Sequence, residues 1–205
     1  MAHQPHLAKH GPGSGARAVV IVLHGGQEVS AAPAWPGPAY ARMVPFALGI
    51  RYGTGGRDVA VWMLRYRVRG WNAPAEDPVR DGRWALDQAR RLHPGAPIVL
   101  VGHSMGGRVA LRLAGEPDVA GVCALAPWIE PGEPGRPVTA AVLIAHGDAD
   151  PVTDPIASAA YAARIGADFL PVPGEKHALL RRPLFWQRLV TGFVANVLHG
   201  SRLPR

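Results

Sequence analysis

The chain has 205 residues, which is enough for one domain with a substantial core and too few for two ordinary domains. Hydrophobic residues make up 48% of it, which argues against a disordered chain. The formal net charge is +7, but the arginines that supply most of the positive charge are scattered, and no nucleic-acid-binding motif accompanies them. We therefore expect a folded protein with no nucleic-acid partner.

Residues 1–15 are rich in His, Gly and Pro and have no apolar centre. They are predicted to form a flexible leader, because a signal peptide or a membrane span needs an apolar stretch. No later apolar run is long enough to cross a bilayer. The lone cysteine, Cys123, lies in an apolar run, which indicates a buried thiol and rules out an intrachain disulfide. These features favour a cytoplasmic protein and leave its number of subunits open.

Apolar runs that predict strands alternate with segments that predict helices. The expected strands lie at 17–26, 58–66, 97–102, 119–126, 138–145 and 167–172, and the main helices between and after them at 39–48, 77–93, 108–114, 156–165 and 183–199. This alternation, with short connections, predicts an α/β fold with a doubly wound, mainly parallel sheet of about six strands and helices on both faces. Residues 16–205 are expected to form this single domain.

Two Asp-Pro pairs predict where helices begin. Asp77 precedes Pro78 and Asp154 precedes Pro155, and each proline suits the first turn of a helix. We expect each aspartate to cap its helix by accepting a hydrogen bond from a free backbone N–H.

The run at 99–107 ends in the sequence Gly-His-Ser-Met-Gly-Gly, with Ser104 at its centre. This G-x-S-x-G pattern predicts a sharp turn from a strand into a helix, which holds the serine hydroxyl at the edge of the sheet. Gly102 and Gly106 leave room for such a turn because they carry no side chain. Ser104 is therefore the candidate nucleophile.

This stretch, with the strand before it and the helix after it, resembles the nucleophile elbow of the α/β-hydrolase superfamily. The resemblance covers about residues 17–199 and implies the α/β-hydrolase fold. The link 128–138 is short where larger relatives insert helices, which implies that no cap domain is present. The resemblance also implies a serine hydrolase that acts on a small carboxylic ester or thioester and water, with an acyl-enzyme on Ser104 and no cofactor or metal.

The family order along the chain is Ser, acid, His, which limits the general base to a histidine after Ser104. His177 follows the last expected strand in a loop, where an imidazole can reach the serine, and it is the predicted base. His146 precedes the best acid and is expected to end a strand. His199 lies at a helix end near the C-terminus.

The acid is predicted to be Asp150, because residues 147–150 are similar to the family pattern Gly-x-x-Asp. Asp148 is the alternative in the same loop, where a short carboxylate can shape the turn by bonding backbone. Glu130, which follows the preceding strand, is a further rival because some family members carry the acid there.

An acyl-transfer site also needs two N–H donors for the oxyanion. The resemblance places one at Met105, directly after the nucleophile, and the other at Gly26, with Gln27 as the alternative. Without a cap, the site is expected to be an open cleft.

The walls of this cleft must come from the loops that follow the strands. Trp71, Trp128 and Val152 are the predicted substrate-binding residues, with Trp35 as a further candidate. The tryptophans could instead pack into the core.

Two other functions are compatible with the sequence. The same three residues serve acyltransferases and small peptidases, because the pocket chooses the acceptor. A non-catalytic ligand-binding protein on the same scaffold is the alternative from another class.

Overall fold

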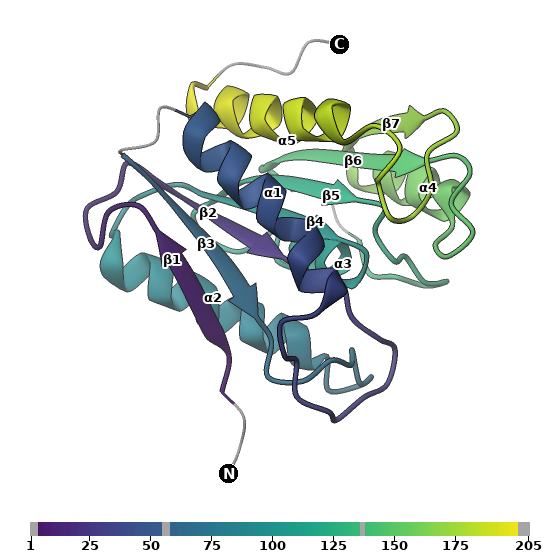
Figure 1. Ribbon diagram of the computed structural model, residues 1–205, viewed down its shortest axis with the longest axis horizontal. Helices are drawn as coiled ribbons and strands as arrows, with labels where there is room; N and C mark the ends of the chain where they lie inside the picture. Colours follow the sequence, from purple (N-terminus) through teal and green to yellow (C-terminus); the bar gives the residue numbers. More distant parts are fainter. Residues whose placement is uncertain (1–3, 55–57, 136–137, 201–205) are drawn as a thin grey trace.

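The computed structural model describes residues 4–54, 58–135 and 138–200. A seven-stranded sheet runs through the molecule, and helices cover both of its faces (Figure 1). The strands are β1 His6–His10, β2 Ala18–Leu23, β3 Val59–Arg65, β4 Ile98–His103, β5 Val119–Leu125, β6 Ala141–Gly147 and β7 Asp168–Val172. The helices are α1 Pro38–Gly53, α2 Asp77–Leu92, α3 Met105–Arg112, α4 Pro155–Ile165 and α5 Pro183–Leu198.

The strand order is β1-β3-β2-β4-β5-β6-β7, and every pair is parallel except β1 with β3. The predicted doubly wound, mainly parallel sheet is therefore confirmed. The central strands β2 and β4 are buried along their whole length, which explains why they are continuously apolar rather than alternating.

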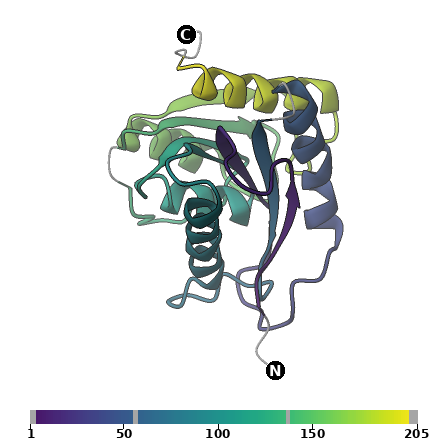
Figure 2. The same cartoon turned by 90° about the vertical axis from the view of Figure 1, so that its left-hand side faces the viewer.

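The sheet separates two hydrophobic cores. Val19 and Ile21 of β2 belong to the core beneath α2, α3 and α4, whereas Val20 and Val22 belong to the core beneath α1 and α5. Successive side chains of a strand point to opposite faces, so β2 contributes to both cores. Figures 1 and 2 show these two helical layers on either side of the sheet.

The first strand corrects the prediction of a flexible leader over residues 1–15. Residues 6–10 pair antiparallel with β3, with Leu7 opposite Leu64, and this edge strand raises the expected six strands to seven. Of these five residues only Leu7 is buried, so β1 lacks the apolar run that marks the central strands. Backbone hydrogen bonds to β3 hold it, and those depend little on side-chain type. Residues 1–3 lie outside the described residues.

The sheet order reverses at β2, whose neighbours are β3 on one side and β4 on the other. Near the carboxyl ends of the strands, Gly102 of β4 lies opposite both Leu23 of β2 and Ala124 of β5. The loops that follow these strands therefore meet at one edge of the sheet, where ligands bind in open α/β sheets. Among the helices of the described ranges, none combines the length and the apolar character needed to cross a membrane.

Candidate active site

Ser104 lies in the turn between β4 and α3 with φ 56° and ψ −122°, a backbone conformation that residues other than glycine rarely adopt. Hydrogen bonds hold it there. Its N–H donates to the carbonyl of Leu125 at 3.0 Å, and its carbonyl accepts from the N–H groups of Arg108 at 3.1 Å and Trp128 at 3.2 Å. The turn therefore presents Ser104, half-buried, at the carboxyl edge of the sheet.

The glycines on either side of Ser104 are required by close backbone contacts. A Cβ atom at Gly102 would lie 2.1 Å from the carbonyl oxygen of Gly106, and one at Gly106 would lie 2.3 Å from the carbonyl oxygen of Leu23. Neither position has room for a side chain. The turn that the G-x-S-x-G pattern predicts is thus present.

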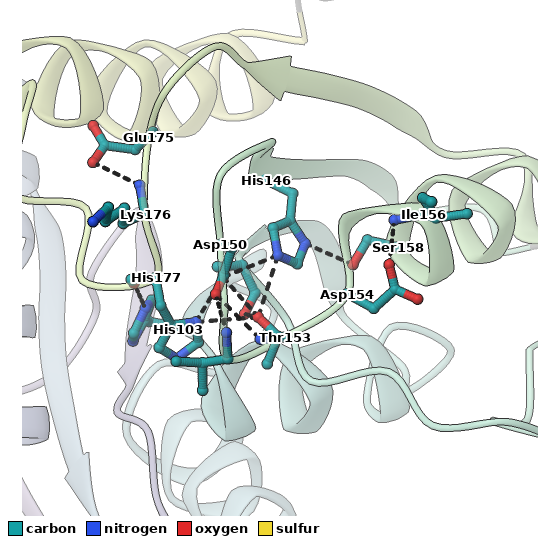
Figure 3. A network of polar contacts seen from close by, with 12 residues as sticks. His103, His146, Asp150, Thr153, Asp154, Ile156, Ser158, Glu175, Lys176 and His177 are labelled. Atoms are coloured by element: carbon teal, nitrogen blue, oxygen red, sulfur yellow. Dashed lines mark hydrogen bonds and ion pairs between the residues drawn. The ribbon is translucent and has the colours of Figure 1, made fainter.

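Asp150 follows β6, and His177 lies in the loop after β7 (Figure 3). His177 Nδ1 lies 2.8 Å from Asp150 Oδ2. The carbonyl oxygen of His177 accepts from His103 Nε2 at 2.7 Å, and the two imidazole rings lie 4.8 Å apart between centroids. This contact ties the His177 loop to the residue directly before Ser104, whereas no hydrogen bond joins Ser104 to His177 among the described residues.

The carboxylate of Asp150 accepts several further hydrogen bonds. Its Oδ1 accepts from the N–H groups of Val152 at 2.8 Å and Thr153 at 3.1 Å, and its Oδ2 accepts from Thr153 Oγ1 at 2.8 Å. Burial raises the pKa of Asp150, but the hydrogen bonds from Val152, His177 and Thr153 together bring that pKa below its ordinary value. Asp150 is therefore ionised at neutral pH and can orient the imidazole of His177.

A second histidine contacts the same carboxylate. His146 is fully buried, and its Nε2 lies 3.1 Å from Asp150 Oδ2 while its Nδ1 lies 2.8 Å from Ser158 Oγ (Figure 3). Burial lowers the pKa of His146, which keeps its imidazole neutral. The sequence places His146 only at the end of a strand. The one signal for its contact is that it lies four residues before the predicted acid.

The rival acids lie elsewhere in the structure. Asp148 is exposed, and its Oδ1 accepts from the N–H of Gly174 at 2.6 Å, which ties the loop after β6 to the loop after β7. Glu130 lies in the link after β5, where its carbonyl accepts from the N–H of Glu133 at 3.0 Å. The imidazole of His177 bonds Asp150 rather than either rival.

The two predicted oxyanion donors are neighbours. A Cβ atom at Gly26 would lie 2.5 Å from Met105 Sδ, and one at Gly25 would lie 3.4 Å from the Cβ of Ser104. The loop after β2 therefore packs against the elbow. The N–H of Gln27, the alternative donor, is already engaged, because it donates to the carbonyl of Arg69 at 2.9 Å.

The prediction that Trp71 lines the cleft is wrong. Trp71 is 2% exposed and meets Trp128 edge-to-face, with ring centroids 6.2 Å apart. The guanidinium of Arg108 lies 4.1 Å from the Trp71 ring and 4.5 Å from the Trp128 ring, so it bridges the two tryptophans. This packing leaves Trp71 almost no surface to offer a ligand, whereas Trp128 stays half-buried beside Ser104.

Trp35 and Val152 are the exposed members of the predicted pocket set. Trp35 is 63% exposed and lines a cavity of about 390 Å³ together with Gly25 and Gly26. Val152 is 67% exposed and lies next to Asp150 in the wall of a cavity of about 330 Å³. Across the ranges that the structure describes, no three His, Cys, Asp or Glu side chains are grouped to hold a metal ion.

The comparisons with known proteins agree with this fold. The Hydrolase_4 family model, described as serine aminopeptidase, S33, matches residues 52–142, a range that contains Ser104 and ends before Asp150 and His177. No curated protein matched the sequence.

Several solved structures are similar over nearly the whole chain. The thermophilic esterase Est2 from Thermogutta terrifontis is 18% identical with a TM-score of 0.73, and the match covers 98% of this chain and 92% of that one. XC6422 from Xanthomonas campestris, described as an α/β serine hydrolase without lid, is 18% identical with a TM-score of 0.70, covering 98% and 91%. Est1E from Butyrivibrio proteoclasticus is 16% identical with a TM-score of 0.68, covering 95% and 94%.

The sheet order, the elbow and these matches define an α/β-hydrolase fold without a lid domain. The chain is thus similar in fold to the α/β hydrolases, and the Hydrolase_4 model matches the part of it that contains the elbow.

Proposed function

We propose that the chain is a serine hydrolase that cleaves a small carboxylic ester or thioester. Ser104 is the nucleophile, His177 the general base and Asp150 the acid that orients it. The observation that carries this proposal is the 2.8 Å contact between His177 Nδ1 and Asp150 Oδ2, made in a loop that is hydrogen-bonded to His103, the residue before Ser104. Est2, which has been solved with propionate bound, is a similar fold that is described as an esterase.

In the proposed reaction, Ser104 Oγ attacks the carbonyl carbon of the substrate while His177 Nε2 accepts the hydroxyl proton. The N–H groups of Met105 and Gly26 stabilise the oxyanion of the tetrahedral intermediate. When the intermediate collapses, the alcohol or thiol leaves with the proton from His177, and an acyl-enzyme remains on Ser104. Water then attacks the acyl group, gives its proton to His177, and releases the acid as Ser104 is reprotonated.

A fluorophosphonate probe tests the nucleophile directly. We expect covalent labelling of the folded wild type and none of the Ser104→Ala variant, as read by mass spectrometry. Folded wild-type protein that is not labelled would favour a ligand-binding protein on the same scaffold.

Kinetics of the double variant test whether the residues act as one unit. Ser104→Ala and His177→Ala should each lower kcat by several orders of magnitude, and the double variant should be scarcely worse than either, because groups of one mechanism are not additive. Additive losses would contradict the shared mechanism.

A peptidase is the second candidate, because the matched family model is described as a serine aminopeptidase. Parallel assays with p-nitrophenyl esters and aminoacyl p-nitroanilides distinguish the two functions. We expect turnover of the esters and little turnover of the anilides, and the reverse ranking would establish the peptidase.

A further inference from the structure

The cavity of about 390 Å³ beside Gly26 has an unusual lining. It lies between the loop after β2, the first turns of α1 and the loop after β3, and isolated bridges from Gln27 to Gly70 and from Pro33 to Val68 join the two loops. Trp35 and Tyr40 give it aromatic walls. Because Gly26 is a proposed oxyanion donor, any group in this cavity lies close to the reacting carbonyl.

The charged side chains that line this cavity are all positive. Arg42 and Arg69 both line it, and no aspartate or glutamate is among its lining residues. A third arginine, Arg65, lies 5.6 Å from the ring of Trp35 and extends the positive region. Low-dielectric walls that carry one sign of charge concentrate ions of the opposite sign.

Arg42 has no ion-pair or hydrogen-bond partner among the described residues, although its Nε is buried. Arg69 donates from Nε to the carbonyl of Pro33 at 3.1 Å and, within the same residues, has no carboxylate partner. Other arginines of the chain do pair with carboxylates, namely Arg67, Arg83, Arg90, Arg108 and Arg112. A buried N–H without an acceptor is costly, so this site favours a ligand that supplies one.

The charge of Arg42 also acts on the strand that leads into the elbow. It contributes to the lowered pKa of His103, which falls to about 3 mainly through burial. The positive charge of Arg42 therefore reaches the residue that precedes Ser104.

We propose that this cavity binds an anionic group of the substrate, so that the preferred ester or thioester carries a carboxylate or another negative charge near the scissile bond. This inference rests on the proposed hydrolase function and deepens it. Guanidinium groups bind carboxylates through paired, charge-assisted hydrogen bonds. Trp35 and Tyr40 cover the apolar spacer between the anion and the reacting carbonyl.

Matched pairs of esters test the substrate class. The acyl-side pair is p-nitrophenyl hemiglutarate, which is anionic, and p-nitrophenyl valerate, which is neutral and of equal chain length. The leaving-group pair is 4-acetoxybenzoate and phenyl acetate. The pair that responds shows whether the anion lies on the acyl side or on the leaving group. For that pair, we expect kcat/KM for the anionic ester to exceed that for the neutral ester by about tenfold or more at low salt, and this ratio to fall as salt is added.

The arginine variants assign that preference to the cavity. Arg42→Gln and Arg69→Gln should each bring the anionic-to-neutral ratio of kcat/KM close to one. Two variants are used so that the test still stands if one of them does not fold. Arg91→Gln is the charge-matched control, because Arg91 is exposed at the far end of α2. It should keep the wild-type ratio. Equal ratios in the wild type and in all variants would overturn the proposal.

A binding measurement separates this proposal from the hydrolase function. Glutarate is titrated into the wild type and into Arg42→Gln by calorimetry, with no turnover required. Saturable binding that Arg42→Gln weakens about tenfold supports the anion site even if no ester is cleaved. Absence of glutarate binding, together with equal turnover of both members of each ester pair, overturns the anion site and leaves the hydrolase function standing.

Discussion

His146 and His177 donate hydrogen bonds to one carboxylate oxygen, Oδ2 of Asp150, at 3.1 Å and 2.8 Å. An ionised carboxylate can only accept, so each imidazole carries a proton on the nitrogen that faces it. Ser158 then donates to Nδ1 of His146 at 2.8 Å and fixes its tautomer. Asp150 is thus held by a buried neutral histidine while it orients the proposed base.

Replacing His146 should change activity through Asp150 rather than through the substrate. His146→Ala removes one donor from the carboxylate, which should raise the pKa of Asp150 and lower kcat roughly tenfold, the effect of one hydrogen bond to a charged group. KM should change little. His146→Gln, whose amide can still donate, should recover most of kcat.

Measurement of kcat and KM against pH for the two variants checks this role. A purely structural role would lower stability equally in both variants without moving the acid limb of the kcat profile. An unshifted acid limb in folded His146→Ala would contradict the positioning role.

Asp150→Asn and Asp148→Asn should have opposite consequences. Asp150→Asn removes the charge that orients His177, so kcat should fall by several orders of magnitude while the protein remains folded. Asp148→Asn weakens the bond to the N–H of Gly174, so it should cost about 1 kcal/mol of stability and leave kcat nearly intact. Steady-state kinetics and thermal melting distinguish them, and the reverse ranking would move the acid to Asp148.

The free energy of unfolding should begin to fall at a pH well above the range in which carboxylates titrate. Burial lowers the pKa of His24 to about 4 and that of His103 to about 3, from an ordinary value of 6.5. Below pH 6.5 the unfolded chain binds a proton at each histidine that the folded chain does not bind, so the free energy of unfolding falls with pH. The lowered pKa of Asp150 acts only below its ordinary value of 3.8.

Urea denaturation at pH 7 and pH 5 measures this loss. Each of these two histidines contributes about 1.4 kcal/mol per pH unit below 6.5, so together they should cost roughly 4 kcal/mol at pH 5. Burial also lowers the pKa values of His146 and His93, which adds to the loss. His103→Gln, whose amide can still donate to the carbonyl of His177, should lose about 2 kcal/mol less than the wild type between pH 7 and pH 5. A free energy of unfolding that stays level between pH 7 and pH 5 would exclude the effect.

The parts of the fold that the sequence predicts are those set by local pattern and burial. β2 and β4 are buried on both faces, so their continuous apolar runs mark them as central strands. The elbow is fixed by contacts that only glycine allows at 102 and 106. β1 is not predicted from the sequence, because Leu7 is its one buried residue and a single buried residue gives no periodic pattern of apolar side chains.

The two helices that begin at Asp-Pro pairs show why local sequence rules for helix capping fail where other side chains compete for the aspartate. Asp154 caps α4 as predicted, with its carboxylate accepting from the N–H of Ile156 at 2.7 Å. Asp77 also begins a helix but makes no cap, because Arg67 and Asn72 bind its carboxylate at 3.2 Å and 2.9 Å. These partners come from the preceding loop, whose path no local pattern specifies.

The surroundings of the candidate site cannot be predicted from the sequence for the same reason. His146 contacts Asp150 only because the loop after β6 folds back on its own strand. The arginine-lined cavity lies between the loop after β2 and the loop after β3. Residues that pair across these two loops, such as Gln27 and Gly70, are more than thirty residues apart in the sequence. Spacing along the chain can order nucleophile, acid and base, but it cannot say which loops meet.

A second cavity, of about 490 Å³, should set the preferred length of the acyl chain. It lies between α1 and residues 178–187, so it begins directly after His177. Phe46, Leu180 and Leu184 give it apolar walls, and Arg42 lines this cavity as well as the one beside Gly26, but the two leucines are 70% and 71% exposed. Each methylene of an acyl chain gains about 0.8 kcal/mol only while a wall covers it. We therefore expect kcat/KM for p-nitrophenyl esters to peak at short acyl chains and then fall.

Filling this cavity should shift that peak. Leu184→Trp occupies part of the space, so kcat/KM should fall most for the longest well-used ester and far less for the acetate. Leu48→Trp is the matched control, because Leu48 is 42% exposed on α1 and does not line the cavity. It should keep the wild-type profile of kcat/KM against chain length. A profile that rises steadily to long acyl chains, or one that Leu184→Trp leaves unchanged, would place the acyl chain outside this cavity.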